Sequence, residues 1–151
     1  MTSLLIAEKP KAAQRIAEAL ADGKVTKKGD KGTYYYEIKH DRKDLIVACA
    51  VGHLFGLAER EKKRGMSYPV FDVEWKPLYE TNKSSAFSKK YYDLLKKLSK
   101  RAQDIIIATD YDIEGETIGW NILRFICNKK SAKRMKYSTF SSSTFLCRST
   151  R

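Results

Sequence analysis

The sequence predicts an α/β protein with a small, mainly parallel sheet that is flanked by helices. Short apolar runs typical of buried strands alternate with segments whose apolar residues recur at helical spacing, and they do so at both ends of the chain. The length of 151 residues is enough for one hydrophobic core and too short for two ordinary domains. We therefore expect one domain over residues 1–140, followed by an irregular tail over residues 141–151.

The N-terminal half is predicted to begin with a strand, a tight turn and a helix. Ser3–Ala7 is short and apolar, as in a buried strand, and Pro10 opens a segment with helical periodicity. The glycine- and lysine-rich stretch 22–32 predicts an exposed loop. Residues 33–39 and 45–50 then predict two strands of a hairpin, and the region up to residue 81 has little periodicity and is expected to be irregular.

The C-terminal half repeats the alternation. Residues 88–102 predict an amphipathic helix with a strongly basic outer face. Residues 104–110 predict a buried strand, residues 114–127 a helix, and residues 134–140 a further strand. The helix is expected to bury Ile118, Ile122, Phe125 and Ile126. The tail has no clear period, and we expect a truncated or non-native continuation there.

Composition and charge restrict the classes of function. Thirty Lys and Arg against 18 Asp and Glu give a formal net charge of +12, which favours a polyanionic partner, with nucleic acid ahead of an anionic membrane surface. No apolar stretch approaches the roughly 20 residues of a membrane span, and the N-terminus lacks the features of a signal peptide. We expect a cytoplasmic protein without a membrane partner. The three cysteines contain no CxxC pair and suggest neither a disulfide framework nor a zinc site.

An acidic cluster stands out against this positive charge. The stretch ATDYDIEGET places Asp110, Asp112, Glu114 and Glu116 within seven positions after a predicted strand, and Glu8 follows the first strand. Ligands of open α/β sheets bind beyond the carboxyl ends of strands, so these acids are expected to line one crevice. Carboxylates that converge there suit Mg²⁺. Glu116 lies about 200° from Glu114 around a helix and is expected to be a secondary ligand.

The acids have other interpretations. At the start of a helix they complement the helix dipole, with Asp112 as the N-cap residue, and two neighbouring carboxylates can share a proton. An aspartyl-phosphate enzyme also places two aspartates after a buried strand, with Asp110 as nucleophile and Asp112 as acid/base. An EF-hand calcium loop is disfavoured because its twelfth position is Asn121 here.

Four stretches, in this order, resemble the N-terminal Toprim domain of type IA DNA topoisomerases, especially archaeal topoisomerase I. They are LLIAEKPKAAQRIAEAL, AVGHLFGL, YPVFDVEWKP and ATDYDIEGETIGWNIL. The most specific features are the Glu that ends the first strand and the TDxDxEGE run about a hundred residues later. The resemblance extends from Leu4 to Phe140 and implies a Toprim, Rossmann-like fold.

The resemblance also implies roles for individual residues. Glu8 matches the acid/base residue near the scissile phosphate, and Asp110, Asp112 and Glu114 match the carboxylates that bind Mg²⁺. Lys9 is then placed to neutralise the phosphate. The family's activity is cleavage and resealing of single-stranded DNA, which relaxes negative supercoils.

Two further residue types complete this interpretation. His53 matches a GH motif of the family and is expected to contact a phosphate or orient a carboxylate. The nucleophilic tyrosine of the family lies outside the Toprim domain, and none of the nine tyrosines here is a candidate for that role. We expect the chain to be inactive in DNA cleavage without the remaining domains of a longer topoisomerase.

Alternative functions stay open at this point. One is another Toprim or aspartate-dependent phosphotransfer enzyme, and the other is a non-catalytic nucleic-acid-binding module whose acids only cap a helix. Basic segments at 24–31, 59–64, 88–101 and 129–136 suit phosphate contacts or a solvated surface. Trp75 is expected in a loop and Trp120 in the core.

Overall fold

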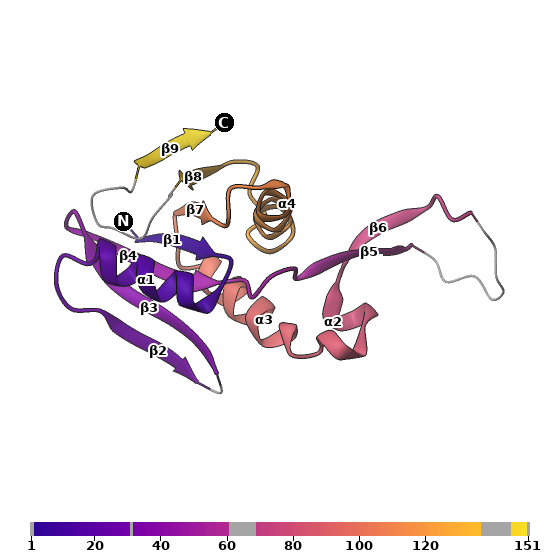
Figure 1. Cartoon of the computed structure of the whole chain (residues 1–151), viewed down its shortest axis with the longest axis horizontal. Coiled ribbons are helices and arrows are strands. Elements are labelled where there is room, and N and C mark those ends of the chain that lie inside the picture. Colours follow the sequence, from indigo (N-terminus) through magenta and orange to yellow (C-terminus); the bar gives the residue numbers. More distant parts are fainter. Residues whose placement is uncertain (1, 31, 61–68, 137–145, 151) are drawn as a thin grey trace.

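The computed structural model describes residues 2–30, 32–60 and 69–136 in full, and residues 146–150 by their backbone. Within these residues a seven-stranded sheet forms the body of the molecule (Figure 1). In sheet order its strands are β2 (Thr26–Asp30), β3 (Thr33–His40), β4 (Lys43–Cys49), β1 (Thr2–Ala7), β7 (Asp104–Ala108), β8 (Ala132–Lys136) and β9 (Leu146–Thr150).

The centre of this sheet is parallel and its edges are antiparallel. Strands β4, β1, β7 and β8 run in the same direction, whereas β2 and β3 at one edge and β9 at the other pair antiparallel with their neighbours. Leu4, Leu5 and Ile6 of the central strand β1 are completely buried. The α/β class with a mainly parallel sheet is therefore confirmed.

Helices cover both faces of the sheet. Helix α1 (Pro10–Leu20) and helix α3 (Ser88–Ser99) each pack against β3 and β4. Residues Leu45 to Cys49 of β4 are all buried, which requires a cover on each face of that strand. Helix α4 (Ile113–Asn121) follows β7 and continues as the π-helical turn η2 (Ile122–Ile126). The predicted helices after residues 10, 88 and 113 are thus confirmed, and so is the β3–β4 hairpin.

Three predictions of irregular structure were wrong. The expected loop at 22–32 contains β2, whose exposed sequence TKKGD has no apolar alternation because it forms the sheet edge. The region 51–81 contains the hairpin of β5 (Phe55–Glu59) and β6 (Val73–Pro77) and the short helix α2 (Leu78–Thr81). In the expected tail, 146–150 forms β9, while residues 137–145 and 151 lie outside the described residues. The domain division at residue 140 stays a prediction.

Two aromatic side chains of the last helix also differ from expectation. Ile118, Ile122 and Ile126 are buried as predicted, but Phe125 is 41% exposed and Trp120 is 52% exposed. The N–H of Cys127 donates to the carbonyl of Ile122, five residues earlier, so the last turn is wider than an α-helical one. Phe125 therefore lies at the edge of the buried face, and Trp120 packs edge-on against it.

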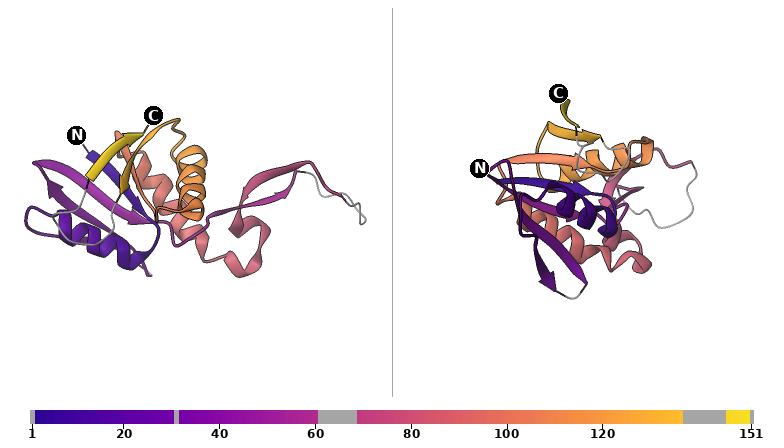
Figure 2. Two further views of the ribbon diagram at one scale, coloured as in Figure 1. Left: turned by 45° about the horizontal axis from the view of Figure 1, so that its top comes forward. Right: turned by 60° about the vertical axis from the view of Figure 1, so that its left-hand side comes forward.

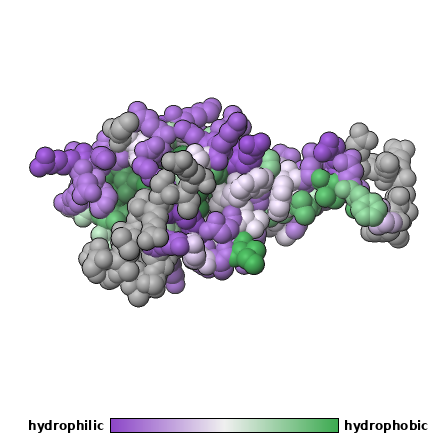
Figure 3. Space-filling view, turned by 90° about the horizontal axis from the view of Figure 1, so that it is seen from above, coloured by the Kyte–Doolittle hydropathy of each residue, from purple (hydrophilic) through white to green (hydrophobic). Residues whose placement is uncertain are grey.

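The β5–β6 hairpin extends away from the main sheet (Figures 1 and 2). Trp75, expected in a loop, lies on β6 and is half-buried. Leu57 on β5 is 61% exposed and Phe71 before β6 is 86% exposed. The space-filling view shows apolar residues on this extension and a largely hydrophilic body (Figure 3). No helix within the described ranges is long and apolar enough to cross a bilayer.

Candidate metal centre

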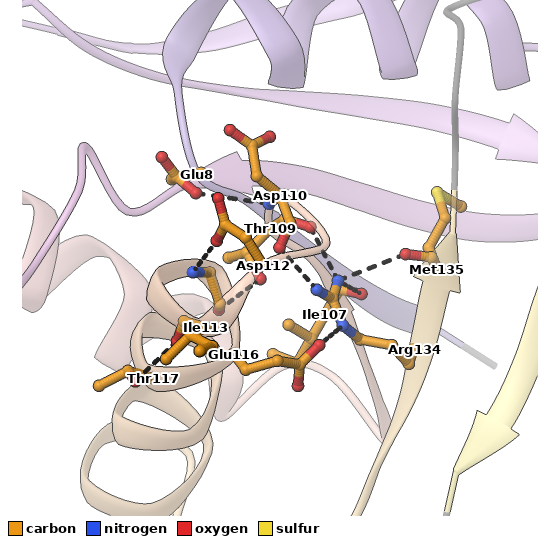
Figure 4. Close-up of polar contacts among 11 residues, drawn as sticks. Glu8, Ile107, Thr109, Asp110, Asp112, Ile113, Glu116, Thr117, Arg134 and Met135 are labelled. Atoms are coloured by element: carbon orange, nitrogen blue, oxygen red, sulfur yellow. Dashed lines mark hydrogen bonds and ion pairs between the residues drawn. The ribbon is translucent and has the colours of Figure 1, made fainter.

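The candidate site lies at the carboxyl ends of two adjacent parallel strands. Strands β1 and β7 pair with Ala7 opposite Ala108, so Glu8 and Asp110 leave the sheet side by side. The backbone N–H of Asp110 donates to Oε2 of Glu8 at 3.4 Å (Figure 4). The two acids therefore lie next to each other at one end of the sheet, and a crevice between them stays a prediction.

Lys9 connects the two acids. Its ammonium lies 2.9 Å from Oδ2 of Asp110 and 3.1 Å from Oε1 of Glu8. The hydrogen bond to Asp110, and then that to Glu8, raises the pKa of Lys9 above its ordinary value. Glu8 itself is only 6% exposed, so a cation beside it compensates for burial of its charge. Lys9 is thus an integral part of the acidic site.

The turn between β7 and α4 is built around Asp112 and Gly115. Asp112 is the N-cap residue of α4, and its Oδ1 accepts from the N–H of Gly115 at 2.7 Å. The hydroxyl of Thr109 donates to the carbonyl of Gly115 at 2.7 Å. A Cβ at Gly115 would lie 2.0 Å from the carbonyl oxygen of Asp110. Only glycine therefore allows the helix to start this close to the strand end.

His53 approaches the acids from the loop after β4. Nε2 of His53 lies 3.3 Å from Oε1 of Glu114. The preceding residue, Gly52, has a φ of +81° and donates its N–H to the carbonyl of Glu8 at 3.3 Å. Glycine adopts this backbone conformation without the strain that a Cβ would cause. The structure thus brings His53 to a carboxylate of the predicted set.

Glu116 points away from the other acids, toward Arg134 on β8 (Figure 4). Nε of Arg134 donates to Oε1 of Glu116 at 2.7 Å. The remaining guanidinium nitrogens donate to the carbonyl oxygens of Thr109 at 2.8 Å and of Asp110 at 2.9 Å, and more weakly to those of Ile107 and Met135. Arg134 is 5% exposed. This arginine holds the backbone of the acidic turn, and Glu116 is its counter-ion.

Sequence reasoning did not find Arg134. The residue was assigned to the basic segment 129–136 and to the predicted strand 134–140 but to no role in the site, because its partners are mainly backbone carbonyls more than twenty positions away. A carbonyl is present at every residue and leaves no pattern in the sequence. The neighbouring lysines, Lys133 and Lys136, are exposed, and no periodicity separates Arg134 from them.

The donor chemistry of the acids suits Mg²⁺, because carboxylate oxygens are hard ligands. Asp110, Asp112 and Glu114 come from one turn but have different partners, which are Lys9, the N–H of Gly115 and His53. Among the described residues, the side chains whose ligand atoms lie within 4.8 Å of one another are a different group, namely Asp22, His40 and Asp41. Binding of one cation by the three site acids therefore requires their side chains to turn toward one another.

Comparison with known proteins identifies the class. Residues 3–140 match the Toprim domain family, and the chain belongs to this family. The chain is 50% identical over 139 residues to the DNA topoisomerase 1 of Methanocaldococcus jannaschii, a match that covers 92% of this chain and 18% of that protein. It is 51% identical over 137 residues to the DNA topoisomerase 1 of Pyrococcus furiosus, covering 89% of this chain and 13% of that protein.

A bacterial relative is more distant. The DNA topoisomerase 3 of Staphylococcus haemolyticus is 32% identical over 144 residues, covering 92% of this chain and 19% of that protein. The chain thus spans less than a fifth of the length of each of these relatives. The predicted resemblance to the Toprim domain of archaeal topoisomerase I is confirmed.

Proposed function

We propose that this chain is the Toprim part of a type IA DNA topoisomerase, which cleaves and reseals single-stranded DNA and so relaxes negative supercoils. The observation that carries the proposal is the joint placement of Glu8, Lys9 and Asp110 at the ends of two parallel strands. The similarity to DNA topoisomerases over nearly the whole chain supports DNA as the substrate. A cytoplasmic location belongs to the same proposal.

The proposed roles follow from chemistry and position. Asp110, Asp112 and Glu114 hold Mg²⁺, which when bound supplies positive charge beside the phosphate. Glu8 is nearly buried and accepts or returns the proton of the reacting oxygen, a task suited to a carboxyl group shielded from water. Lys9 stabilises negative charge on the phosphate, because the contacts with Glu8 and Asp110 hold its ammonium at the place where the phosphate is to react.

His53 and Glu116 have supporting roles in this proposal. His53 orients Glu114 from the loop after β4, as their 3.3 Å contact suggests. Glu116 anchors Arg134 and is a weak candidate for a ligand, because its carboxylate is already paired. The nucleophilic tyrosine belongs to the remaining domains of the longer enzyme, so we propose that the chain alone, with residues 1–140 as its folded unit, does not cleave DNA.

The N-cap of α4 favours one competing function. Because Oδ1 of Asp112 accepts from the N–H of Gly115, the acids have a structural use without any metal. A nucleic-acid-binding module that uses its acids only in this way would be indifferent to Mg²⁺. An aspartyl-phosphate enzyme would instead become phosphorylated on Asp110, which mass spectrometry after treatment with a small phosphate donor detects.

The decisive experiment places this chain within a longer relative. In the DNA topoisomerase 1 of Methanocaldococcus jannaschii, the matching 139 residues are replaced by this chain, and relaxation of a negatively supercoiled plasmid is followed on gels with and without Mg²⁺. We expect Mg²⁺-dependent relaxation that the double variant Asp110→Asn/Asp112→Asn loses by at least about a hundredfold, a drop typical of removing a principal electrostatic group.

A matched control uses the second acidic group of the chain. Asp22→Asn/Asp41→Asn removes the same two charges from the other group of acids, and the chimera should keep its activity. Calorimetric Mg²⁺ titration of the 151-residue chain adds a readout that does not depend on catalysis. An active Asp110→Asn/Asp112→Asn chimera, or a folded but inactive unsubstituted chimera, would overturn the proposal.

A further inference from the structure

We propose that Tyr111 and Lys136 form a subsite for one nucleotide of single-stranded nucleic acid beside the acidic turn. The ring of Tyr111 stacks on the base, and the ammonium of Lys136 contacts a phosphate of the same strand. The inference rests on the proposed function, because it assumes that a single strand reaches the acids at the end of β7. It adds a recognition element that the acids themselves do not provide.

Tyr111 is exposed at a place where the backbone is held firmly. Its side chain is 63% exposed, whereas Tyr36 and Tyr91 of the core are below 10%. It stands between Asp110, whose carbonyl accepts from Arg134, and Asp112, which caps α4. The turn therefore presents an aromatic ring to solvent directly beside the acids, although burying that ring would have stabilised the fold.

Two cations lie close to this ring. Nζ of Lys136 lies 4.1 Å from the ring centroid of Tyr111, and the guanidinium carbon of Arg134 lies 5.5 Å from it. Arg134 is buried and bonded to carbonyls, so it cannot follow a ligand, whereas Lys136 is exposed. Cation–π contacts of this kind restrict the ring. A ring that is already restricted loses less entropy when a base stacks on it.

Lys136 carries a positive charge that is available to a ligand. Within the described part of the chain its ammonium lies over the Tyr111 ring and makes no ion pair with a carboxylate. Lys9, in contrast, is bonded to both Glu8 and Asp110. The acidic turn repels a polyanion, so a nearby cation without a carboxylate partner is where a phosphate gains most.

The chemistry of the pair selects single strands. An aromatic side chain stacks on a base only when that base has left its neighbours, and bases of a duplex are stacked on one another. Stacking tolerates any base because each has a π-face. The subsite should therefore prefer single-stranded over duplex DNA and show little sequence preference.

The chain contains a matched control pair away from the acids. Nζ of Lys27 lies 3.9 Å from the ring centroid of Tyr34, which is 40% exposed. This pair lies on β2 and β3, at the sheet edge, with two strands, β4 and β1, between it and β7. It has the same chemistry as the proposed subsite but no neighbouring acidic turn. If binding depends on the subsite, substitutions of Tyr34 and Lys27 should leave it unchanged.

The test measures binding of a fluorescein-labelled oligodeoxythymidine to the 151-residue chain by anisotropy at low salt. Tyr111→Ala should weaken binding between about fivefold and about a hundredfold, the effect of one lost base stack. Tyr111→Phe should bind like the unsubstituted chain because it keeps the ring. Lys136→Met should make the negative slope of log K against log salt shallower by about 0.7, the value for one phosphate contact on a single strand.

The control variants and a second probe decide the outcome. Tyr34→Ala and Lys27→Met should leave both affinity and salt slope unchanged. An oligonucleotide with one 2-aminopurine should be quenched by the unsubstituted chain and by Tyr111→Phe, and not by Tyr111→Ala. Equal binding by Tyr111→Ala, an equal loss in Tyr34→Ala, or no binding by the unsubstituted chain would overturn the subsite. The proposed function is judged separately, by Mg²⁺-dependent relaxation in the chimera.

Discussion

Replacement of Arg134 by methionine tests whether hydrogen bonds from this side chain to backbone carbonyls hold the acidic turn in place. The methionine side chain is unbranched and has no N–H groups, so the substitution removes two short hydrogen bonds, at 2.8 and 2.9 Å, to the carbonyl oxygens of Thr109 and Asp110. A hydrogen bond to a charged group contributes about 1.5–3 kcal/mol. The two bonds together amount to about 3–6 kcal/mol, part of which the buried apolar methionine offsets.

We therefore expect Arg134→Met to lower the free energy of unfolding by roughly 3 kcal/mol. For a domain of this size that corresponds to a fall of roughly 6–12 °C in Tm. Urea unfolding and thermal melts followed by circular dichroism measure both quantities. The chimeric topoisomerase should also lose Mg²⁺-dependent activity, because the backbone that carries Asp110 is no longer fixed.

Glu116→Gln is the control that separates the carbonyl contacts from the ion pair. The Glu116 side chain is 57% exposed, so its ion pair with Arg134 is expected to contribute less than about 1 kcal/mol. The reasoning fails if the free energy of unfolding of Arg134→Met lies within about 1 kcal/mol of that of the unsubstituted chain. It also fails if Glu116→Gln lowers the free energy of unfolding as much as Arg134→Met does, because the carbonyl contacts then do not hold the turn.

Other predictions concern single groups. Gly115→Ala should displace the turn, since its Cβ would lie 2.0 Å from the Asp110 carbonyl oxygen, and should cost about 1–3 kcal/mol in a denaturant titration. Burial raises the pKa of Cys49 to about 11, so iodoacetamide at pH 8 should alkylate this thiol only after unfolding, as mass spectrometry can show. The hydrogen bond from Lys28 lowers the pKa of Glu37, so ionised Glu37 stabilises the fold at neutral pH and this contribution is lost as acid protonates the carboxylate. In a series of urea unfolding curves at different pH, Glu37→Gln should therefore lose less stability than the unsubstituted chain as the pH falls.

The sequence was sufficient to predict the strands that consist of buried apolar runs. Ser3–Ala7 and residues 104–108 stand out because central parallel strands are apolar on both faces. The positions of Glu8 and Asp110 followed from the rule that ligands bind beyond the carboxyl ends of such strands. Both predictions depend on local composition together with one general property of α/β sheets.

The remainder depended on contacts that a sequence does not display. The edge strand β2 is polar and exposed, so nothing distinguishes it from a loop. Trp120 was expected in the core because α4 is apolar on much of its circumference, and periodicity then does not show which residues face inward. The pairing of Glu116 with Arg134, and of His53 with Glu114, joins segments that only the tertiary fold brings together.

The pairing of β1 with β7 also determines when the site can form. Glu8 and Asp110 are 102 positions apart and meet only when these two strands are adjacent. Contacts of such high sequence separation require closure of a long loop and are slow to form. A nascent chain therefore carries Glu8 and Lys9 for about a hundred residues of synthesis before Asp110 exists. The complete site can form only once the central sheet has formed.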